Sequence, residues 1–398
     1  MICLTLESSY DAVVIGAGPA GSAFAKKCAK EGMSVLVIEK KKEIGSPVRC
    51  GEGIAEHTED ELGIKLKPQA IGSPIDGAAL YSPNHKKLVF KTPATQGYVL
   101  ERKIFDKHLA IEAGRAGAHF LPHTLVDSVI EKNGKPAGVK VTHMGEQMEF
   151  HASLVVSAEG MEARIARQLG FDAKASLYDV DTCFEYEMVN VECERLIELF
   201  FSNRLAPRGY VWVFPKGSDV ANVGIGIGGS SGANPKALLD QFISENKQRF
   251  GKAEPVEFKG GVISVGAPLD HLVADNAMVV GTAAHQVDPI HGGGIGLAIQ
   301  AGSFAADAAI AAFRKSDFSR KQLASYEKEF NEKVAPKLAK RLKLRKVMEK
   351  LSDDDWNHIF NELSPEDVQK ILDGEFKPVA AKVVLKRPTL LKVLTALM

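Results

Sequence analysis

Cys50 is a residue whose type and neighbours suggest chemistry. It stands in the stretch SPVRCGEGI, residues 46–54, after Arg49 and before Gly51 and Gly53. A neighbouring cation lowers the pKa of a thiol and favours the reactive thiolate. In apolar surroundings the thiol stays neutral and can donate a proton. The stretch therefore predicts a reactive Cys50, and the alternative is a small apolar side chain that only packs.

A glycine motif, GAGPAG, predicts a phosphate-binding turn. It places Gly16, Gly18 and Gly21 between an apolar strand and a helix, and Glu39 ends the next apolar strand. The glycines allow a sharp turn, close approach of backbone to a pyrophosphate and close packing of the helix on the sheet. The positive end of the helix faces the phosphates. Because the Glu39 carboxylate can accept hydrogen bonds from ribose hydroxyls, we expect a dinucleotide.

Two later segments return to this site and favour FAD over NAD. They are VVSAEG at 155–160 and VVGTAAHQVDPIHGGGIGLAIQAG at 279–302. Gly292, Gly293 and Gly294 let backbone lie against a planar ring, and the helix that follows presents its N-terminus to the ring. A nicotinamide dehydrogenase usually completes its cofactor site within one compact domain. The returns therefore fit an extended cofactor with its pyrophosphate at one helix and its flavin at another.

Three aromatic residues, Tyr210, Trp212 and Phe214, alternate along a predicted strand. Alternate side chains of a strand point to the same face, so we expect an aromatic wall that suits a long apolar substrate. The alternative is a side of the strand that faces the core. Polar residues near the glycine cluster are either structural hydrogen-bond partners or proton donors: His285, Asp288 and His291.

The order of the elements predicts an α/β flavoprotein of two domains with a helical C-terminal region. A buried strand returns near residue 277, so the first domain is interrupted and resumed. We expect a Rossmann-like FAD-binding domain, a mostly antiparallel substrate-binding sheet and a C-terminal helical region. Their ranges are 1–73, 97–175 and 275–315 for the first, 74–96 and 176–274 for the second, and 316–398 for the third.

Composition excludes several classes of partner. Lysine plus arginine equal aspartate plus glutamate at 50 each, which argues against nucleic acid. The cysteines form no CxxC pair and predict neither a disulfide framework nor a metal site.

No leader segment and no run of roughly 18 apolar residues is visible, so we expect a cytoplasmic protein. Basic segments at 333–350 and 377–398 predict peripheral contact with an anionic membrane surface, and the alternative is a solvated helix face.

The sequence to about residue 310 resembles flavoproteins typified by aromatic hydroxylases, and among them the geranylgeranyl reductases. The resemblance lies in PVRCGEGI at 47–54, YVWVFPKGSDVANVGIG at 210–226 and DPIHGGGIGLAI at 288–299. It implies that FAD contacts Ala20, Glu39, Cys50, Gly51, Gly53, Arg102, Thr282, Gly293, Gly294 and Ile295, with the adenine at Val126. For Arg102 the alternative is a charge that only begins a helix.

The resemblance also has two departures. The usual Gly-Asp is Gly281-Thr282 here, and the usual Asp-Gly is Glu159-Gly160. Threonine can still hydrogen-bond a hydroxyl of the cofactor, but it carries no charge. We therefore expect weaker flavin binding than is usual in the family.

The resemblance implies a reaction on a long lipid. Isolated double bonds of geranylgeranyl chains in archaeal-type lipids, the digeranylgeranylglycerophospholipids, would receive a hydride from reduced flavin and a proton from a nearby donor. Cys50 is the first candidate for that donor. An external electron donor, ferredoxin-like or NAD(P)H, is implied. The alternatives are an FAD-dependent monooxygenase of an aromatic or polyprenyl substrate and a non-catalytic prenyl-lipid carrier.

Overall fold

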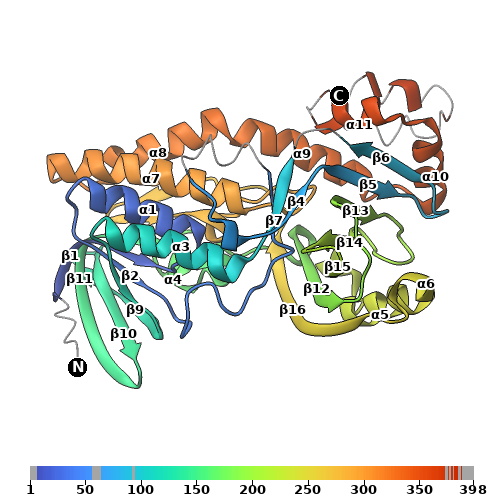
Figure 1. Ribbon diagram of the computed structural model, residues 1–398. Coiled ribbons are helices and arrows are strands. Elements are labelled where there is room, and N and C mark those ends of the chain that lie inside the picture. Colours follow the sequence, from blue (N-terminus) through green and yellow to red (C-terminus); the bar gives the residue numbers. More distant parts are fainter. Residues whose placement is uncertain are drawn as a thin grey trace.

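The structure is a computed structural model, and it describes residues 7–55, 64–91, 95–372, 375, 378–379, 381–383 and 387. Figure 1 shows two lobes side by side. The N-terminal lobe contains the first sheet, and the other contains the second sheet. Helices α7 (Ile295–Lys315), α8 (Arg320–Lys333) and α9 (Ala335–Met348) follow one another along one side of the molecule.

The first lobe begins with a parallel strand–helix–strand unit. β1 (Ser9–Ile15) leads through a glycine turn into α1 (Pro19–Lys30), and β2 (Val35–Ile38) pairs in parallel with β1. Two later strands extend the parallel sheet, β11 (Glu146–Ser157) beside β1 and β18 (Ala277–Val279) beside β11. The predicted interruption and return of the sheet is thus confirmed.

Shorter elements complete this lobe. The sheet order is β17–β18–β11–β1–β2–β8, and β9 and β10 extend β11 as antiparallel strands. The remaining elements are β8 (His119–Leu121), β9 (Thr124–Lys132), β10 (Lys135–His143), β17 (Val273–Ala274), α3 (Arg102–Arg115) and α4 (Arg164–Gln168). Figure 1 places α1, α3 and α7 over one face of the parallel strands.

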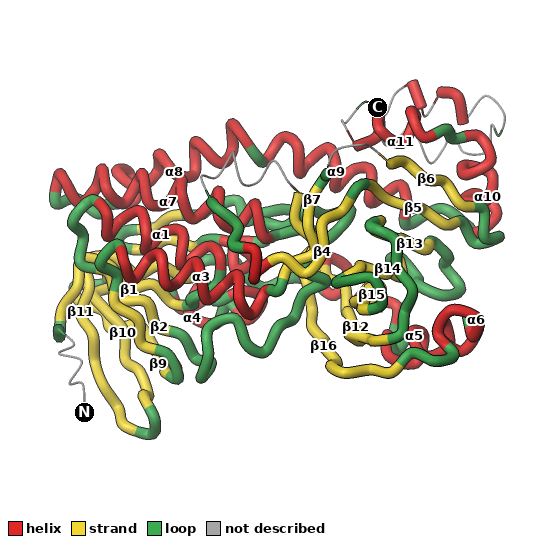
Figure 2. Tube along the Cα trace, viewed as in Figure 1, coloured by secondary structure: helices red, strands yellow, loops and turns green. Residues whose placement is uncertain are grey.

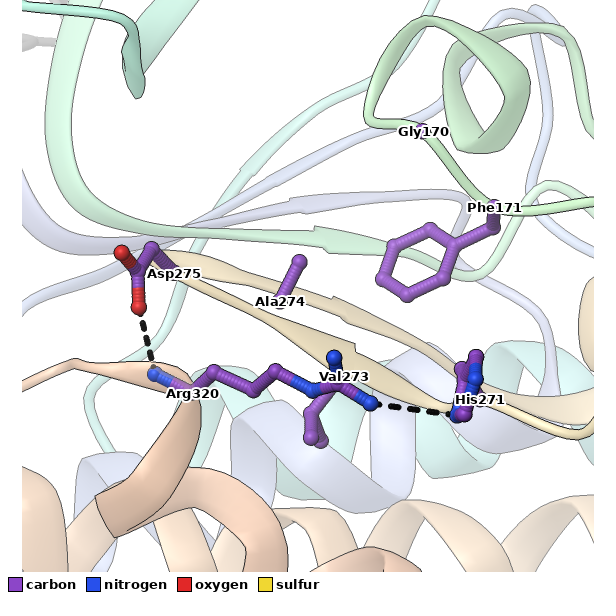
Figure 3. Close-up of a pocket in the computed structure, with 7 residues that line it drawn as sticks. All are labelled: Gly170, Phe171, His271, Val273, Ala274, Asp275 and Arg320. Atoms are coloured by element: carbon purple, nitrogen blue, oxygen red, sulfur yellow. Dashed lines mark hydrogen bonds between the residues drawn. The ribbon is translucent and has the colours of Figure 1, made fainter.

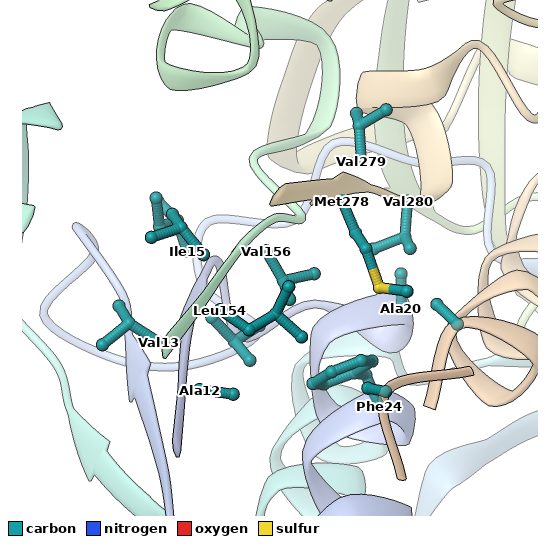
Figure 4. Close-up of a cluster of buried hydrophobic side chains, with 14 of the residues drawn as sticks. Ala12, Val13, Ile15, Ala20, Phe24, Leu154, Val156, Met278, Val279 and Val280 are labelled. Carbon is teal, nitrogen blue, oxygen red and sulfur yellow. The ribbon is translucent and has the colours of Figure 1, made fainter. Parts of the chain in front are cut away.

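The core of the first lobe explains why the sequences of its strands are continuous apolar runs. Ala12, Leu154 and Met278 come from three different strands and are completely buried together with Phe24 of α1 (Figure 4). Strands covered on both faces bury every side chain, so alternation disappears. Each large apolar side chain buried in this way contributes roughly 1.5–3 kcal/mol.

Helix α7 differs from one expectation. It is long and apolar enough to cross a membrane by length and composition, whereas the sequence was expected to hold no such segment. However, 61% of its apolar window is buried inside the protein. A Cβ at Gly302 would lie 2.3 Å from the Ala20 carbonyl oxygen, so α7 packs closely on α1. These contacts are those of a core helix.

The second lobe is built on a seven-stranded sheet (Figure 2) with the order β16–β12–β15–β14–β13–β5–β6. Every pairing is antiparallel except β13 with β5, which confirms the predicted mostly antiparallel sheet. Its strands are β5 (Gly77–Tyr81), β6 (Lys87–Lys91), β12 (Val180–Val189), β13 (Leu196–Phe200), β14 (Tyr210–Pro215), β15 (Val220–Gly228) and β16 (Glu254–Ser264). Helices α5 (Pro235–Glu245) and α6 (Lys247–Phe250) belong to the same lobe.

A small sheet joins the lobes, and helices end the chain. The small sheet pairs β3 (Gly53–Ala55) with β7 (Gly97–Leu100) and β7 with β4 (Ile71–Ile75). Helix α8 inserts Leu323, Tyr326 and Phe330 into the core of the first lobe. Helices α10 (Asp353–Glu362) and α11 (Pro365–Leu372) follow α9. Short 3₁₀ turns lie at Pro68–Ala70, Gly160–Glu162, Leu177–Asp179, Gly229–Ser231 and Gly281–Ala284.

Candidate active site

One face of the second sheet carries aromatic and charged residues in register. Trp212 lies opposite Gly224, Gly224 opposite Glu185, and Glu185 opposite Lys259, so one row crosses four strands. Opposite residues of an antiparallel pair are close neighbours on one face of the sheet. The adjacent row on the same face consists of Tyr210, Gly226, Cys183 and Gly261.

Gly224 makes room for the indole of Trp212. A Cβ at Gly224 would lie 2.3 Å from two ring atoms of Trp212. The indole therefore reaches across β15, and its Nε1–H donates to Glu185 Oε2 at 2.7 Å. Along β14 the ring of Trp212 lies 6.1 Å from that of Tyr210 and 6.2 Å from that of Phe214. The prediction that the three rings share one face is confirmed.

The turn that carries Cys50 rests on this aromatic row. A Cβ at Gly51 would lie 3.1 Å from the Phe214 ring and 3.4 Å from Trp212 Nε1, so glycine lets the turn approach the sheet. A Cβ at Gly53 would lie 3.6 Å from Phe214. The predicted thiol is thus held at the boundary between the two lobes.

The surroundings of Cys50 favour a neutral thiol. Burial raises the pKa of the Cys50 thiol, and Arg102 opposes that rise. The expectation that Arg49 stabilises a thiolate is not met, because Arg49 is exposed and the cation that acts on Cys50 is Arg102. Arg102 itself holds Asp106 through two hydrogen bonds of 2.9 and 2.7 Å. Cys50 is therefore suited to carry a proton rather than to attack as a thiolate.

Glu52 joins the Cys50 turn to the second sheet. Its Oε1 accepts from the backbone N–H of Arg102 at 2.9 Å. Its Oε2 accepts from Asn222 at 2.7 Å and from Lys216 and Lys259 at 3.1 Å each. Burial opposes the charged form, but the two lysines outweigh burial and hold the pKa of Glu52 below its ordinary value. Glu52 is 1% exposed, so the lobes meet at a buried ionic cluster.

The first glycine motif forms an open cradle at the N-terminus of α1. Gly16 has φ +107°, and a Cβ there would lie 2.3 Å from the Ala158 carbonyl oxygen. A Cβ at Gly21 would lie 2.0 Å from the Gly16 carbonyl oxygen, whereas a Cβ at Gly18 would meet nothing within 4 Å. No side chain caps this helix. The space before its free N–H groups therefore fits the pyrophosphate of FAD.

Glu39 is fixed beside that cradle. Its Oε2 accepts from the backbone N–H of Ala17 at 3.0 Å and its Oε1 from that of Lys41 at 2.9 Å. The carboxylate is thus oriented by backbone N–H groups from two places, the glycine turn after β1 and the segment after β2. Ala20, in the first turn of α1, faces Gly281 in the 3₁₀ turn after β18, and a Cβ at Gly281 would lie 3.0 Å from that of Ala20.

The second glycine cluster begins α7 and lies against the same face of the second sheet. Gly292 has φ +69°, and a Cβ there would lie 3.5 Å from Ile263 of β16. Gly294 precedes the first residue of α7, Ile295, which is buried. The Tyr210 hydroxyl donates to the carbonyl oxygen of His291 at 2.8 Å. The Cys50 turn and the Gly292–Gly294 cluster, both predicted to contact the flavin, therefore face the same surface of the second sheet.

Polar residues near this cluster bind to one another. Asp288 Oδ1 accepts from the backbone N–H of Ile290 at 3.0 Å, and its Oδ2 pairs with His291 and with Arg341 of α9. Burial opposes the charge, but His291 and Arg341 hold the pKa of Asp288 well below its ordinary value. Burial lowers the pKa of His285, which hydrogen-bonds backbone of another segment. The structure thus favours structural roles for these three predicted residues.

Three other predicted positions lie on the first lobe. Val126 is buried on β9, and its carbonyl oxygen accepts from Arg164. Thr282 lies in the 3₁₀ turn that follows β18. Glu159, at the other departure from the family pattern, accepts from the backbone N–H of Ile165 at 2.9 Å and so orients the start of α4.

Sequence reasoning missed the charged members of the site, which are Glu52, Glu185, Glu187, Lys216 and Lys259. A signal existed in TCFEYEMV, where two glutamates occupy one face of an otherwise apolar strand. Within the described residues no group of three or more His, Cys, Asp or Glu side chains could hold a metal ion.

Two hollows lie on the surface, one away from this site and one beside it. One of about 360 Å³ lies at the outer edge of the first sheet, where Arg320 binds Asp275 through its backbone N–H at 2.7 Å and lies 3.1 Å from His271 (Figure 3). None of its lining residues belongs to the site described above. A smaller cleft of about 40 Å³ is lined by residues that include Tyr210, Arg208 and Trp356.

Comparison with known proteins gives consistent matches. Residues 179–263 match the family model of the geranylgeranyl reductase catalytic domain, and residues 9–208 match that of an FAD binding domain. The chain is 40% identical to the digeranylgeranylglycerophospholipid reductase of Methanocaldococcus jannaschii, over 97% of this chain and 98% of that protein. It is 39% identical to the enzyme of the same name from Methanothrix thermoacetophila, over 91% and 93% of the two chains.

Solved structures resemble the whole fold. A geranylgeranyl bacteriochlorophyll reductase-like protein from Thermoplasma acidophilum is 34% identical, with a TM-score of 0.90 over 98% of this chain and 100% of that one. A flavin-dependent brominase superposes with a TM-score of 0.74 over 92% of each chain, at 20% identity. The second likeness concerns the fold alone.

Proposed function

The chain belongs to the digeranylgeranylglycerophospholipid reductase family of the geranylgeranyl reductases, and from this premise we propose how it acts. It is an FAD-dependent oxidoreductase that saturates carbon–carbon double bonds of geranylgeranyl chains in digeranylgeranylglycerophospholipids. The single observation that carries the mechanism is the meeting of three segments on one sheet face: the Cys50 turn, the Gly292–Gly294 cluster and the aromatic row of β14.

The cradle at α1 and the cluster at α7 are proposed to hold opposite ends of the cofactor. Gly16, Gly18 and Gly21 leave room for the pyrophosphate, and Glu39 is oriented toward a ribose. When bound and reduced, FAD supplies the hydride. The turn at Cys50 and the start of α7 are proposed to enclose the ring and keep water away from it.

Cys50 is proposed to supply the proton. An isolated alkene has no carbonyl group to stabilise hydride addition, so a proton must reach the second carbon. Burial keeps the thiol neutral, which is the state that can donate. The Glu52 backbone N–H donates to Cys50 Sγ at 3.2 Å and orients the sulfur.

The aromatic row is proposed to line the path of the lipid chain. Tyr210 and Trp356 both line the cleft of about 40 Å³. Phe201 lies between Tyr210 and Trp356, with ring centroids 6.0 and 5.0 Å away. A continuous set of rings from the cleft to Trp212 suits a long apolar chain. The external electron donor is proposed to be ferredoxin-like or NAD(P)H.

The test is anaerobic incubation of the reduced holoenzyme with a digeranylgeranyl phospholipid, followed by mass spectrometry. The expected product gains two hydrogens for each double bond reduced. Replacing Cys50 by Ala is expected to retain yellow flavin and lower turnover roughly 100-fold or more, the usual contribution of a positioned acid. Cys193→Ala is the matched control, because Cys193 packs against a different hydrophobic cluster, which includes Leu239 and Phe242 of α5.

The outcomes distinguish the proposed function from the alternative functions. Full turnover of Cys50→Ala would assign Cys50 a packing role only. Incorporation of oxygen into the lipid under air, with no anaerobic turnover, would favour a monooxygenase. A purified protein that binds prenyl lipid without flavin colour would favour a carrier.

A further inference from the structure

The ionic cluster under the Cys50 turn has too few positive charges for its carboxyl groups. Lys216 donates to Glu52 at 3.1 Å and Glu187 at 3.0 Å, and it pairs with Glu101 at 2.9 Å. Lys259 donates to Glu52, Glu187 and Asn222 at 3.1 to 3.2 Å. An ammonium group has three donors, so both lysines are fully engaged without Glu185.

Glu185 is therefore a buried acid without a dedicated cation. It is 3% exposed. Its Oε2 accepts from Trp212, while its Oε1 is buried and has no hydrogen-bond partner among the residues that the structure describes. Lys259 Nζ lies 3.4 Å from that oxygen, farther than from its acceptors on Glu52, Glu187 and Asn222. An isolated carboxylate is costly to bury, and protonation removes that cost.

The protonation state follows from these contacts. Burial raises the pKa of Glu185 to about 8, with Lys259 and the Trp212 hydrogen bond opposing the rise and Glu52 adding to it. At neutral pH the side chain thus holds a proton on the oxygen that lacks a partner. The titratable groups near it are Lys259 from β16, Glu187 and Cys183 from β12, and Glu52 and Cys50 from the turn above.

The position of Glu185 relates it to Cys50. Both Glu185 and Cys183 lie within electrostatic range of the Cys50 thiol. The indole that holds Glu185 also supports Gly51, next to Cys50. Glu185 therefore lies on the sheet face directly beneath the turn that carries the proposed proton donor.

We propose, building on the proposed reduction, that Glu185 keeps a proton at this face and returns it to Cys50 in each catalytic cycle. Cys50 transfers its proton to one alkene carbon while the other carbon receives the hydride, and the sulfur is left as a thiolate. The proton on Glu185 Oε1 passes to that sulfur. The resulting carboxylate regains a proton from solvent after the product leaves. Glu185 is thus a positioning residue that acts through Cys50.

The test compares wild type, Glu185→Gln and the control Glu257→Gln as anaerobic holoenzymes. Glutamine keeps an acceptor oxygen for the Trp212 N–H but carries no acidic proton. Glu257 lies on the same sheet, is 46% exposed and is 3.8 Å from Lys259. Its variant therefore removes a carboxylate but leaves the proton on Glu185 in place. Rates are measured from about pH 6 to about pH 10, for a single turnover of prereduced enzyme and for repeated turnover.

The expected result has two parts. A single turnover starts with Cys50 protonated, so Glu185→Gln leaves it within about twofold of wild type, and repeated turnover slows roughly 100-fold. Wild-type repeated turnover falls as pH rises through about 8, whereas Glu257→Gln follows wild type. A wild-type rate of repeated turnover in Glu185→Gln, or no fall of the wild-type rate in that range, overturns the proposal.

Infrared spectroscopy gives a readout that does not need activity. A band of a buried protonated carboxyl group is expected in wild type at neutral pH, and it should vanish above about pH 8 and be absent in Glu185→Gln. If Glu185→Gln does not fold, the pH dependence of the wild-type band and rate carries the test. No such band refutes the inference about Glu185. Absence of lipid reduction by wild type refutes the proposed function instead.

Discussion

At the scale of single residues, Glu52 is the carboxylate on which the buried charges converge. It binds two lysines, an amide and the backbone N–H of Arg102. Its backbone has φ +73°, a conformation that few non-glycine residues adopt. The ionic contacts thus hold both the fold of the Cys50 turn and its position on the second sheet.

Replacing Glu52 by Gln is expected to lower the free energy of unfolding by about 3–5 kcal/mol, because it removes the more deeply buried of the two carboxylates that Lys216 and Lys259 share. Chemical denaturation at neutral pH measures the loss. Glu101→Gln is the control, since Glu101 is 37% exposed and its pairing with Lys216 contributes less than about 1 kcal/mol. Equal losses in the two variants would contradict the central role of Glu52.

The same residue makes stability depend on pH with a definite sign. The lysines hold the pKa of Glu52 below the ordinary value of 4.5. A carboxyl group whose pKa is lower in the folded protein than in the unfolded chain stabilises the folded protein at pH values above the unfolded-state pKa. This contribution is lost as the pH falls through the folded-state pKa. The difference between wild type and Glu52→Gln should therefore shrink below about pH 4.5.

At the scale of elements, β15 is shaped by its glycines. Asn222, Gly224 and Gly226 share the face toward the Cys50 turn. The missing side chains leave the space that Trp212 crosses to reach Glu185. Glycine weakens a strand interior, and it occurs there where a close approach is needed.

Gly224→Ala is expected to displace the indole and lower stability by about 1–3 kcal/mol, the usual cost of overpacking. The same change should lower lipid reduction, since Trp212 then no longer supports Gly51. Thermal unfolding and Trp fluorescence measure the first effect, and turnover measures the second. Gly217→Ala is the control, because a Cβ there meets nothing within 4 Å. An unshifted indole in Gly224→Ala would contradict this account of the strand.

At the scale of the whole molecule, α9 connects the two lobes. Arg341 pairs with Asp288 of the first lobe, and Arg345 donates to the Val265 carbonyl oxygen at 2.6 Å and pairs with Glu349 at 2.7 Å. Part of the basic charge at 333–350 is therefore structural and does not face solvent. The other basic segment, 377–398, falls largely outside the described residues.

The exposed lysines of α9 remain available for a membrane surface, which we propose as the source of the lipid. They are Lys337, Lys340, Lys343 and Lys346. Replacing all four by Gln is expected to weaken flotation with anionic vesicles roughly fivefold per lysine, and wild-type binding should fall with added salt. Lys321→Gln with Lys328→Gln on α8 is the control. Wild-type binding that depends on neither the salt concentration nor the anionic lipid content of the vesicles would contradict the proposal.

Local spacing was enough to determine the cofactor end of this protein. Gly16, Gly18 and Gly21 lie within one turn and helix start, so their spacing along the chain is enough to predict that turn. The alternation of Tyr210, Trp212 and Phe214 likewise follows from the period of a strand. The α/β class and the returning strand also followed from sequence, whereas the domain limits and the roles of the site residues stay predictions.

Only the tertiary structure decided which charges meet. Cys50 has Arg102 rather than Arg49 as its effective cation, and Glu52 meets Lys216 and Lys259, which are far away in the chain. Contacts of this kind depend on strand register and on how two lobes pack, and sequence spacing encodes neither. The same holds for Glu185, whose pKa is raised by burial that exists only when four strands lie side by side.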